Sequence, residues 1–232
     1  KIQTLEKTKA VKLKKNKVNI KIGLALSGGG AKGLAHVGVL KVLEEQNIKI
    51  DYITGTSMGA VVAALYSAGY TPDQIENILL DINWNGYISG ELDSKKVPLE
   101  KKLGNQKYAA SVRYDKEFNF SLPKGFGSTE MIYLRLKKLL ANVDNINDFD
   151  KLPIPLRIVT TDLNTGKAVA LSHGDLARAI TASVAIPTIL DPVEIDGSLY
   201  VDGLISRNLP VEDVIAMGAD IVIASDVGNE VK

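Results

Sequence analysis

Strand-like and helix-like stretches alternate along most of this chain of 232 residues. Short runs of β-branched and aliphatic residues are separated by longer segments in which apolar side chains recur every three or four positions. The first pattern is typical of buried strands and the second of amphipathic helices. The pattern predicts an α/β protein, a three-layer α/β/α sandwich with a mostly parallel central sheet. The expected strands are 20–26, 48–54, 155–161, 168–171, 193–195, 198–201 and 220–225, and the expected helices are 33–45, 58–68, 71–80, 128–141, 175–182 and 211–217.

Residues 82–127 interrupt this alternation. Asparagine, glycine and lysine are frequent there, and aromatic residues are scattered among them. Two short strands, 109–114 and 117–122, are expected to form a hairpin around Asp115-Lys116. A segment of this length is compatible with a lid over a binding site and equally with a structural excursion.

Positive charge is concentrated at the start of the chain. Residues 1–21 contain eight lysines and one glutamate, whereas the whole chain has a net charge of only +1, so the remainder is acidic. This asymmetry predicts a basic arm or linker at 1–19 in front of one domain at 20–232. The arm is expected either to be solvated or to touch anionic lipid. Nucleic acid is not an expected partner, because no aromatic residues interleave with the lysines and no recognition module follows them.

Two features narrow the chemistry and the topology. The chain has no cysteine, which excludes disulfides and thiolate catalysis. The uncharged stretch 52–72 contains one continuous helical pattern, at 58–68, about half of the ~20 residues that a membrane span needs. This segment is therefore expected to be a buried helix.

The most specific motif is Gly55-Thr56-Ser57-Met58-Gly59, a G-x-S-x-G pentapeptide between an expected strand and an expected helix. This is the context of a nucleophile elbow, in which a tight turn lifts the serine hydroxyl at the start of the helix. The helix N-terminus then favours negative charge beside the serine. The motif predicts a serine hydrolase with Ser57 as the nucleophile.

A second glycine-rich turn follows the first expected strand. The segment Gly28-Gly29-Gly30-Ala31-Lys32-Gly33 satisfies G-x-G-x-x-G, and Asp51, at the end of the next strand, has the spacing of the ribose-binding acid of a dinucleotide fold. A nicotinamide or flavin oxidoreductase is therefore the rival hypothesis. The same loop also fits an oxyanion hole, because its exposed N–H groups can hold negative charge. Adjacent strands would put it beside Ser57, and we favour that interpretation.

A nucleophilic serine needs a base, and histidine is the usual one. His36 lies among apolar positions of the first expected helix and is expected to be a packed structural residue, whereas His173 is expected at the surface. No histidine follows Asp202, so the chain order of an α/β-hydrolase triad is not met. The preferred base is the carboxylate of Asp202, at a strand end next to Gly203.

Four blocks together carry a resemblance to a known family. The glycine loop, the elbow, the segment Ala182-Ser183-Val184-Ala185-Ile186-Pro187 and Asp202-Gly203 occur in family order, and from about residue 20 to 227 the chain resembles the patatin-like phospholipase family. The stretches 147–153 and 192–210 most resemble the passenger domain of bacterial patatin-type autotransporters, a group with a Fusobacterium phospholipase of the A1 type. Leu204 departs from the pattern, since the family usually has Gly or Ala there.

The resemblance implies a lipid acyl hydrolase, a phospholipase of the A1 type on the three-layer fold. It implies a catalytic dyad of Ser57 and Asp202, an acyl-serine intermediate, and no metal or cofactor. The oxyanion hole would consist of the N–H groups of Gly28, Gly29 and Gly30. Lys32 stands where the family has arginine or lysine, and Pro187 would lie in the wall of the site. The full set of supporting positions is Lys32, Gly33, Gly55, Gly59, Gly203 and Pro187.

The resemblance also implies partners and a location. The expected partners are a phospholipid or other acyl ester as substrate and a membrane surface. The expected location is the bacterial cell surface, the outer membrane or the medium, with the cytoplasm as the alternative, because cytosolic relatives share the same blocks. Two other classes stay open: a dinucleotide-dependent oxidoreductase and a catalytically silent lipid-binding module.

Overall fold

The computed structural model describes residues 20–82, 113–114, 120–121 and 129–228. Its largest element is a seven-stranded sheet with the order β7-β8-β5-β2-β1-β9, in which β6 pairs with β5. The strands are β1 (Ile22–Leu26), β2 (Tyr52–Thr56), β5 (Leu156–Asp162), β6 (Ala168–Leu171), β7 (Val193–Ile195), β8 (Ser198–Asp202) and β9 (Ile221–Ser225).

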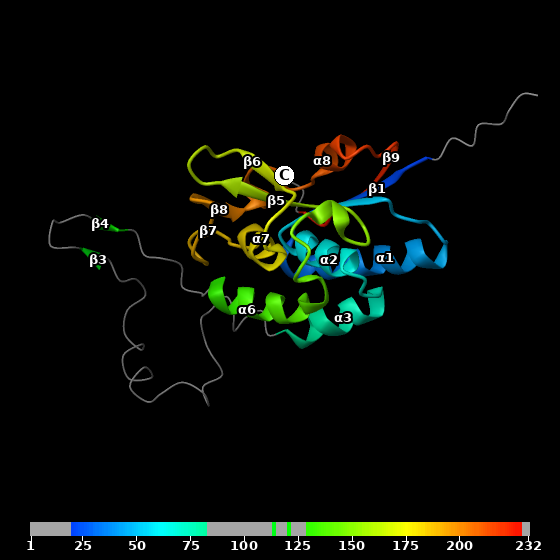
Figure 1. The fold of residues 1–232 in the computed structure, drawn as a ribbon, viewed down its shortest axis with the longest axis horizontal. Coiled ribbons are helices and arrows are strands. Elements are labelled where there is room, and N and C mark those ends of the chain that lie inside the picture. Colours follow the sequence, from blue (N-terminus) through cyan, green and yellow to red (C-terminus); the bar gives the residue numbers. More distant parts are fainter. Residues whose placement is uncertain (1–19, 83–112, 115–119, 122–128, 229–232) are drawn as a thin grey trace, which may run out of the picture.

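Helices cover both faces of the sheet, which gives three layers of unequal size. Figure 1 shows most of the helices on one side of the sheet and the short helix α8 on the other. The predicted α/β/α sandwich is therefore confirmed, with one thin outer layer. The α-helices are α1 (Ala35–Glu45), α2 (Met58–Ser67), α3 (Pro72–Asp81), α6 (Thr129–Leu139), α7 (Leu176–Ser183) and α8 (Val211–Ala216), and the 3-10 turns are η1 (Gly30–Leu34), η2 (Ala141–Val143), η3 (Phe149–Lys151) and η4 (Gly203–Ile205).

The strand directions confirm a mostly parallel sheet. The pairs β1–β2, β1–β9 and β2–β5 are parallel, whereas β5–β6, β5–β8 and β7–β8 are antiparallel. Five strands therefore run one way, and β6 and β8 run the other. The antiparallel flank comes in part from a two-residue hairpin at Asp196-Gly197, where φ is 51° and 79°. Positive φ at both central residues is the conformation that such turns require.

Most predicted elements lie within a few residues of the observed ones, and β2 is the informative exception. It covers Tyr52–Thr56 rather than 48–54, because residues 48–51 close the turn after α1, where the N–H of Ile48 donates to the C=O of Leu43 over 2.8 Å. The placement of Asp51 at the end of a strand was wrong, since this residue precedes β2. Gly55 and Thr56 belong to the strand itself.

Three predictions concern residues that the structure describes only in part or not at all. The expected hairpin is represented by β3 (Arg113–Tyr114) and β4 (Phe120–Ser121), which pair antiparallel, while its turn at Asp115-Lys116 lies outside the described residues. The expected lid at 82–127 lies almost entirely outside the described residues, and the basic arm at 1–19 lies entirely outside them. Within the described ranges no helix is both long and apolar enough to cross a membrane.

The central strand β2 is buried on both faces, and this fixes the loop that follows β8. On the side of α2, a side chain at Gly55 would collide with the backbone of Gly59. On the side of α8, the hydroxyl of Thr54 donates to the C=O of Pro210 over 2.9 Å, and that of Thr56 donates to the C=O of Arg207 over 3.0 Å. These two bonds tie the segment after Asp202 to the middle of the sheet.

Candidate active site

Two strand ends meet along one edge of β5. Parallel β2 ends with Thr56 opposite Val159, and antiparallel β8 ends with Asp202 opposite Thr160. Because β6 occupies the other edge of β5 over the same residues, β2 and β8 share one edge and face each other end to end. The sheet topology therefore brings residues 57 and 202 together, although they are 145 positions apart in the chain.

Ser57 stands on the turn between β2 and α2. Its φ of 52° and ψ of −122° are rare for a residue with a side chain, and only surrounding contacts hold such a conformation. The serine Oγ donates a hydrogen bond of 2.7 Å to Oδ2 of Asp202. Only 5% of Ser57 is exposed. The predicted elbow is present, with its hydroxyl aimed at the predicted carboxylate.

Asp202 is fully buried, and its environment favours the protonated form more than water does. Burial raises the pKa of the Asp202 carboxyl to about 6, against the opposing effect of two donated hydrogen bonds. Those bonds come from the Leu204 N–H to Oδ1, at 2.9 Å, and from the hydroxyl of Ser57. A carboxylate with a pKa near neutrality is a stronger base than an exposed aspartate and is still ionised at pH 7. Leu204, the departure from the family pattern, contacts Asp202 through its backbone and has an exposed side chain.

The end of α7 and the residues that follow it contact both members of the pair. The N–H of Ser57 donates to the Ser183 hydroxyl over 2.8 Å, and the N–H of Asp202 donates to the C=O of Ala185 over 2.9 Å. Sequence reasoning identified this block but singled out Pro187, which is half-buried. It missed Ser183 and Ala185, and the only available signal was their membership of the block.

The glycine loop lies beside the serine, as expected from adjacent strands. A side chain at Gly28 would come within 3.0 Å of the Ser57 Cβ. The Gly28 N–H, however, already donates to the C=O of Asn208 over 3.2 Å. The Gly28 N–H is therefore engaged in this structure, and the oxyanion role expected of Gly29 and Gly30 stays a prediction.

Asn208 is a further residue that sequence reasoning missed. Its Oδ1 lies next to Gly28, is buried, and has no hydrogen-bond partner among the described residues. Lys32, by contrast, is exposed, and its N–H donates to the C=O of Gly29 over 3.2 Å. This bond closes the turn of η1 at Gly30, whose φ is +54°.

The other predicted glycines let backbone segments approach each other. A side chain would collide with Met58 at Gly33, with the Leu26 carbonyl at Gly59 and with the Val159 carbonyl at Gly203. Together with Gly55, these positions pack β1, β2, α2 and the Asp202 turn closely around Ser57. Their support for the site is steric.

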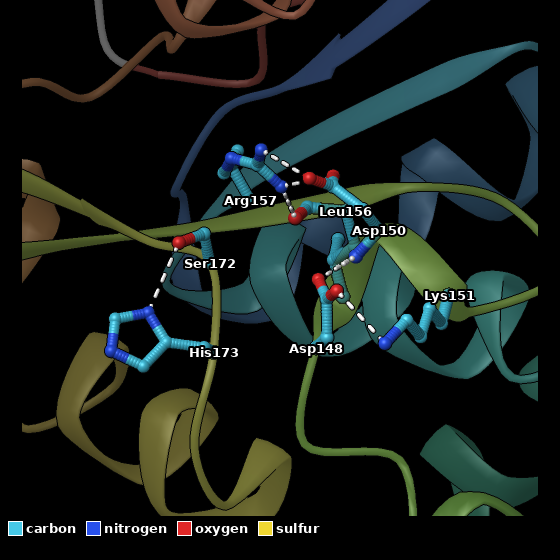
Figure 2. A network of polar contacts seen from close by, with 7 residues as sticks. All are labelled: Asp148, Asp150, Lys151, Leu156, Arg157, Ser172 and His173. Carbon is cyan, nitrogen blue, oxygen red and sulfur yellow. Dashed lines mark hydrogen bonds and ion pairs between the residues drawn. The ribbon is translucent and has the colours of Figure 1, made fainter.

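Neither histidine contacts the Ser57–Asp202 pair. Buried His36 donates from Nε2 to the C=O of Ser27 over 2.8 Å, so in its neutral form Nδ1 accepts from the Ser225 hydroxyl, also at 2.8 Å. Burial lowers the pKa of His36, against the opposing effects of the Ser27 hydrogen bond and the charge of Asp226. His36 thus holds the residue before the glycine loop. His173 is exposed and lies 3.2 Å from the Ser172 hydroxyl, as Figure 2 shows.

The rival dinucleotide hypothesis fails on the position of Asp51. Its carboxylate accepts the Ile22 N–H over 3.0 Å and pairs with Lys21 over 3.1 Å, at the start of β1. The glycine loop follows the other end of the same strand. A ribose-binding acid would have to stand at the carboxyl ends of the strands, beside that loop. In the part of the chain that the structure describes, no three His, Cys, Asp or Glu side chains are grouped to hold a metal ion.

Fold and site together define a class: a mixed α/β protein whose sheet presents a serine elbow to a buried aspartate. The family model of the patatin-like phospholipases matches residues 24–215. The chain belongs to the patatin-like phospholipase family.

Known relatives agree with this assignment. An uncharacterized NTE family protein of Mycobacterium tuberculosis is 33% identical over 207 residues, which cover 88% of this chain and 48% of that protein. The lysophospholipase NTE1 of Yarrowia lipolytica is 32% identical over 211 residues, 90% of this chain and 13% of that protein. This chain thus spans about half or less of the length of these relatives.

One solved structure supports the fold. VipD of Legionella pneumophila superposes with a TM-score of 0.50 at 14% identity, over 82% of this chain and 47% of that one. At this identity the likeness concerns the fold alone.

Proposed function

We propose that this protein is a lipid acyl hydrolase that works through a Ser57–Asp202 dyad. The observation that carries the proposal is the buried 2.7 Å hydrogen bond from the Ser57 Oγ to the Asp202 Oδ2 at a strained elbow. Asp202 accepts the hydroxyl proton as the serine oxygen attacks an ester carbonyl. The alcohol or lysolipid leaves with that proton, and an acyl-serine remains. Water, deprotonated by Asp202, then releases the fatty acid and restores Ser57.

The developing oxyanion needs donors on the glycine-loop side of the serine. The N–H groups of Gly29 and Gly30 are the candidates, since that of Gly28 is engaged by Asn208. The N-terminus of α2 adds a favourable dipole beside Ser57. Oxyanion donors of this kind contribute about 10²- to 10³-fold in rate.

The substrate that we propose is a glycerophospholipid, cleaved at the sn-1 ester as by a phospholipase of the A1 type. Family membership supports a lipid ester, the relative named lysophospholipase adds lysophospholipids as candidates, and the A1 preference rests on the autotransporter likeness of residues 147–153 and 192–210. Phospholipids with a fluorescent acyl chain at either the sn-1 or the sn-2 position distinguish these outcomes. Release of the sn-2 chain alone would contradict the A1 assignment.

Labelling with a fluorophosphonate tests the dyad directly. The reagent is expected to modify wild-type protein at Ser57, as located by mass spectrometry, and to leave Ser57→Ala unmodified. Folded wild-type protein that neither reacts nor hydrolyses a short-chain ester would instead be a silent lipid-binding module. Calorimetric titration with NAD and NADP is expected to show no binding, and binding of either would restore the oxidoreductase hypothesis.

We further propose that residues 1–19 are a basic arm and that residues 20–232 form the catalytic domain. Lysines near an anionic membrane contribute about 1 kcal/mol each, and salt screens this term. The arm therefore predicts tighter binding to anionic than to zwitterionic vesicles. Deleting residues 1–18 is expected to weaken that binding at low salt and to spare hydrolysis of a soluble ester. Equal vesicle binding before and after deletion would leave the arm as a linker.

The location that we propose is the cell surface, the outer membrane or the medium of a bacterium, with this chain as an autotransporter passenger domain. The support is the same likeness of residues 147–153 and 192–210. Protease added to intact cells that produce the full-length protein is expected to digest this domain. Protection of the domain until the cells are lysed would favour the cytoplasmic alternative.

A further inference from the structure

The last residue of α7 places a hydroxyl between two other elements. Ser183 is fully buried, and its Oγ donates to the C=O of Val159, in β5, over 2.6 Å. The same oxygen accepts the N–H of Ser57 over 2.8 Å. One side chain therefore links a strand, a helix end and the elbow.

The direction of these bonds is fixed by chemistry. A carbonyl only accepts, so the single proton of the Ser183 hydroxyl goes to Val159. A lone pair of Oγ is then left for the N–H of Ser57, which the turn carries away from the sheet just after Thr56 pairs with Val159. The Ser183 hydroxyl thus takes the place that a neighbouring strand would have as hydrogen-bond acceptor for the N–H of Ser57, the first residue after β2.

The same region also holds the other member of the pair. Gly203 packs against the carbonyl of Val159 so closely that a side chain would collide with it. The C=O of Ala185 accepts the N–H of Asp202 over 2.9 Å. Ser57 and Asp202 are therefore both fixed relative to Val159 and to residues 183–185.

We infer that Ser183 is a positioning residue, whose hydroxyl holds the peptide of Ser57 so that the serine Oγ reaches Asp202. The inference rests on the dyad function proposed above. The φ of 52° at Ser57 is a strained value that persists only while surrounding contacts impose it. Without the Ser183 oxygen, the buried N–H of Ser57 loses its partner, and the elbow relaxes toward another conformation. Small misplacements of a reacting group reduce the rate of the chemical step more than they reduce binding.

Two substitutions of equal volume separate the hydroxyl from packing. Ser183→Thr keeps a hydroxyl and Ser183→Val lacks it, while both add similar bulk. We expect kcat for a short-chain ester to be at least about tenfold lower in Ser183→Val than in Ser183→Thr, with KM within about twofold. The rate of fluorophosphonate labelling is expected to fall by the same factor. Ser183→Ala, which adds no volume, gives the same comparison against wild type if the larger side chains prevent folding.

Thr181 supplies a matched control in the same helix. Its hydroxyl is equally buried but donates to the C=O of Ala177, one turn back, over 2.7 Å. Thr181→Val is expected to keep kcat within about twofold of wild type, whatever its effect on the melting temperature. Folded Ser183 variants with equal kcat would overturn the positioning role and leave the dyad standing. Wild-type protein that fails to react with fluorophosphonate would instead overturn the dyad, and this inference with it.

Discussion

Two clusters of this protein contain the residue types of hydrolytic chemistry, but they differ in almost every physical respect. One is the buried Ser57–Asp202 pair. The other, which we call the surface cluster, consists of Asp148, Asp150, Lys151, Arg157, Ser172 and His173 and is drawn in Figure 2. The surface cluster has a serine, a histidine and an aspartate close together, as Asp148 and His173 form a β-bridge. By residue type alone it looks more like a triad than the buried pair does.

The hydrogen bonds of the surface cluster serve local structure. The Asp148 carboxylate accepts the Asp150 N–H over 3.1 Å and pairs with Lys151 over 3.5 Å, so it is directed away from the histidine ring. Arg157 makes two bonds to the Asp150 carboxylate, at 2.6 and 3.0 Å. These contacts hold η3 against the start of β5.

The pKa values of one aspartate in each cluster are shifted in opposite directions. Hydrogen bonds from Arg157 hold the pKa of the Asp150 carboxyl below its usual value, whereas burial raises that of Asp202 to about 6. A depressed pKa makes a weak base, and a raised one makes a useful base near neutrality. The comparison teaches that burial and strand-end geometry distinguish the proposed catalytic pair from a structural cluster of the same residue types.

Replacing the two serines is the largest test of this comparison. Ser57→Ala is expected to reduce ester hydrolysis by at least about a thousandfold, because the nucleophile is gone. Ser172→Ala removes only a contact to an exposed histidine and is expected to keep full activity. Both variants should be assayed with circular dichroism as a check on folding. More than about a tenth of wild-type activity in Ser57→Ala would refute the assignment of Ser57.

Replacing the two aspartates is expected to give the next largest effect. Asp202→Asn preserves the shape of the side chain but cannot accept the proton of Ser57, and we expect kcat to fall by at least about a hundredfold. Asp148→Asn, in the surface cluster, is expected to leave kcat within about twofold of wild type. The measurement is steady-state hydrolysis of a short-chain ester. Near-normal kcat in folded Asp202→Asn would show that another group serves as the base.

These contrasts also show how far sequence reasoning reached. The elbow at Ser57 was predictable because glycine spacing and a strand-to-helix change are both local patterns. Asp202 was chosen as its partner because it lies at an expected strand end next to Gly203 and because of the family resemblance. The contact itself depends on which edge of β5 each strand occupies, and no local pattern carries that information. The structure places the Ser57 Oγ 2.7 Å from the Asp202 Oδ2, and the catalytic dyad itself stays a prediction.

Three features of the site could not be predicted from the sequence. The role of Ser183 depends on where the end of α7 meets the sheet. The engagement of the Gly28 N–H depends on a loop residue, Asn208, that is 180 positions away in the chain. The predicted position of Asp51 was wrong because the apolar residues Ile48 and Ile50 gave the pattern of a strand, whereas they lie in the turn after α1. The first two depend on tertiary contacts, and the third on the local hydrogen bond that ends α1.

The two histidines offer a smaller test, on stability rather than chemistry. His36→Ala leaves the Ser27 carbonyl and the Ser225 hydroxyl without their partner and opens a cavity, so we expect a loss of about 2–4 kcal/mol in unfolding free energy. His173→Ala is expected to change it by less than about 0.5 kcal/mol. Urea titration measures both. A folded histidine variant as inactive as Ser57→Ala would contradict the dyad and restore a triad.

The smallest test uses the pH dependence of stability to compare the two carboxyls. Because the folded pKa of Asp202 lies above the usual 3.8, its ionisation opposes folding. The cost is absent below about pH 4, develops as the pH rises, and is complete above about pH 6, where a pKa of about 6 in place of 3.8 corresponds to about 3 kcal/mol. The unfolding free energy of Asp202→Asn relative to wild type is therefore expected to increase by up to that amount between pH 4 and pH 8. The amide also changes hydrogen bonds, but that contribution to the unfolding free energy is the same at both pH values and cancels when the two differences are compared.

Asp150→Asn supplies the control of opposite sign. Its folded pKa is lowered, so the stabilisation by its carboxylate is present above the usual pKa of 3.8 and is lost as the pH falls through the folded value. About half of the Asp150 side chain is exposed, so we expect less than about 1 kcal/mol, and little change between pH 5 and pH 8. Urea titrations between pH 4 and pH 8 give the unfolding free energy of each variant relative to wild type as a function of pH. If the Asp202→Asn curve were as flat as the Asp150→Asn curve, the Asp202 carboxyl would not be desolvated in the folded protein, and the electrostatic difference between the two clusters would be lost.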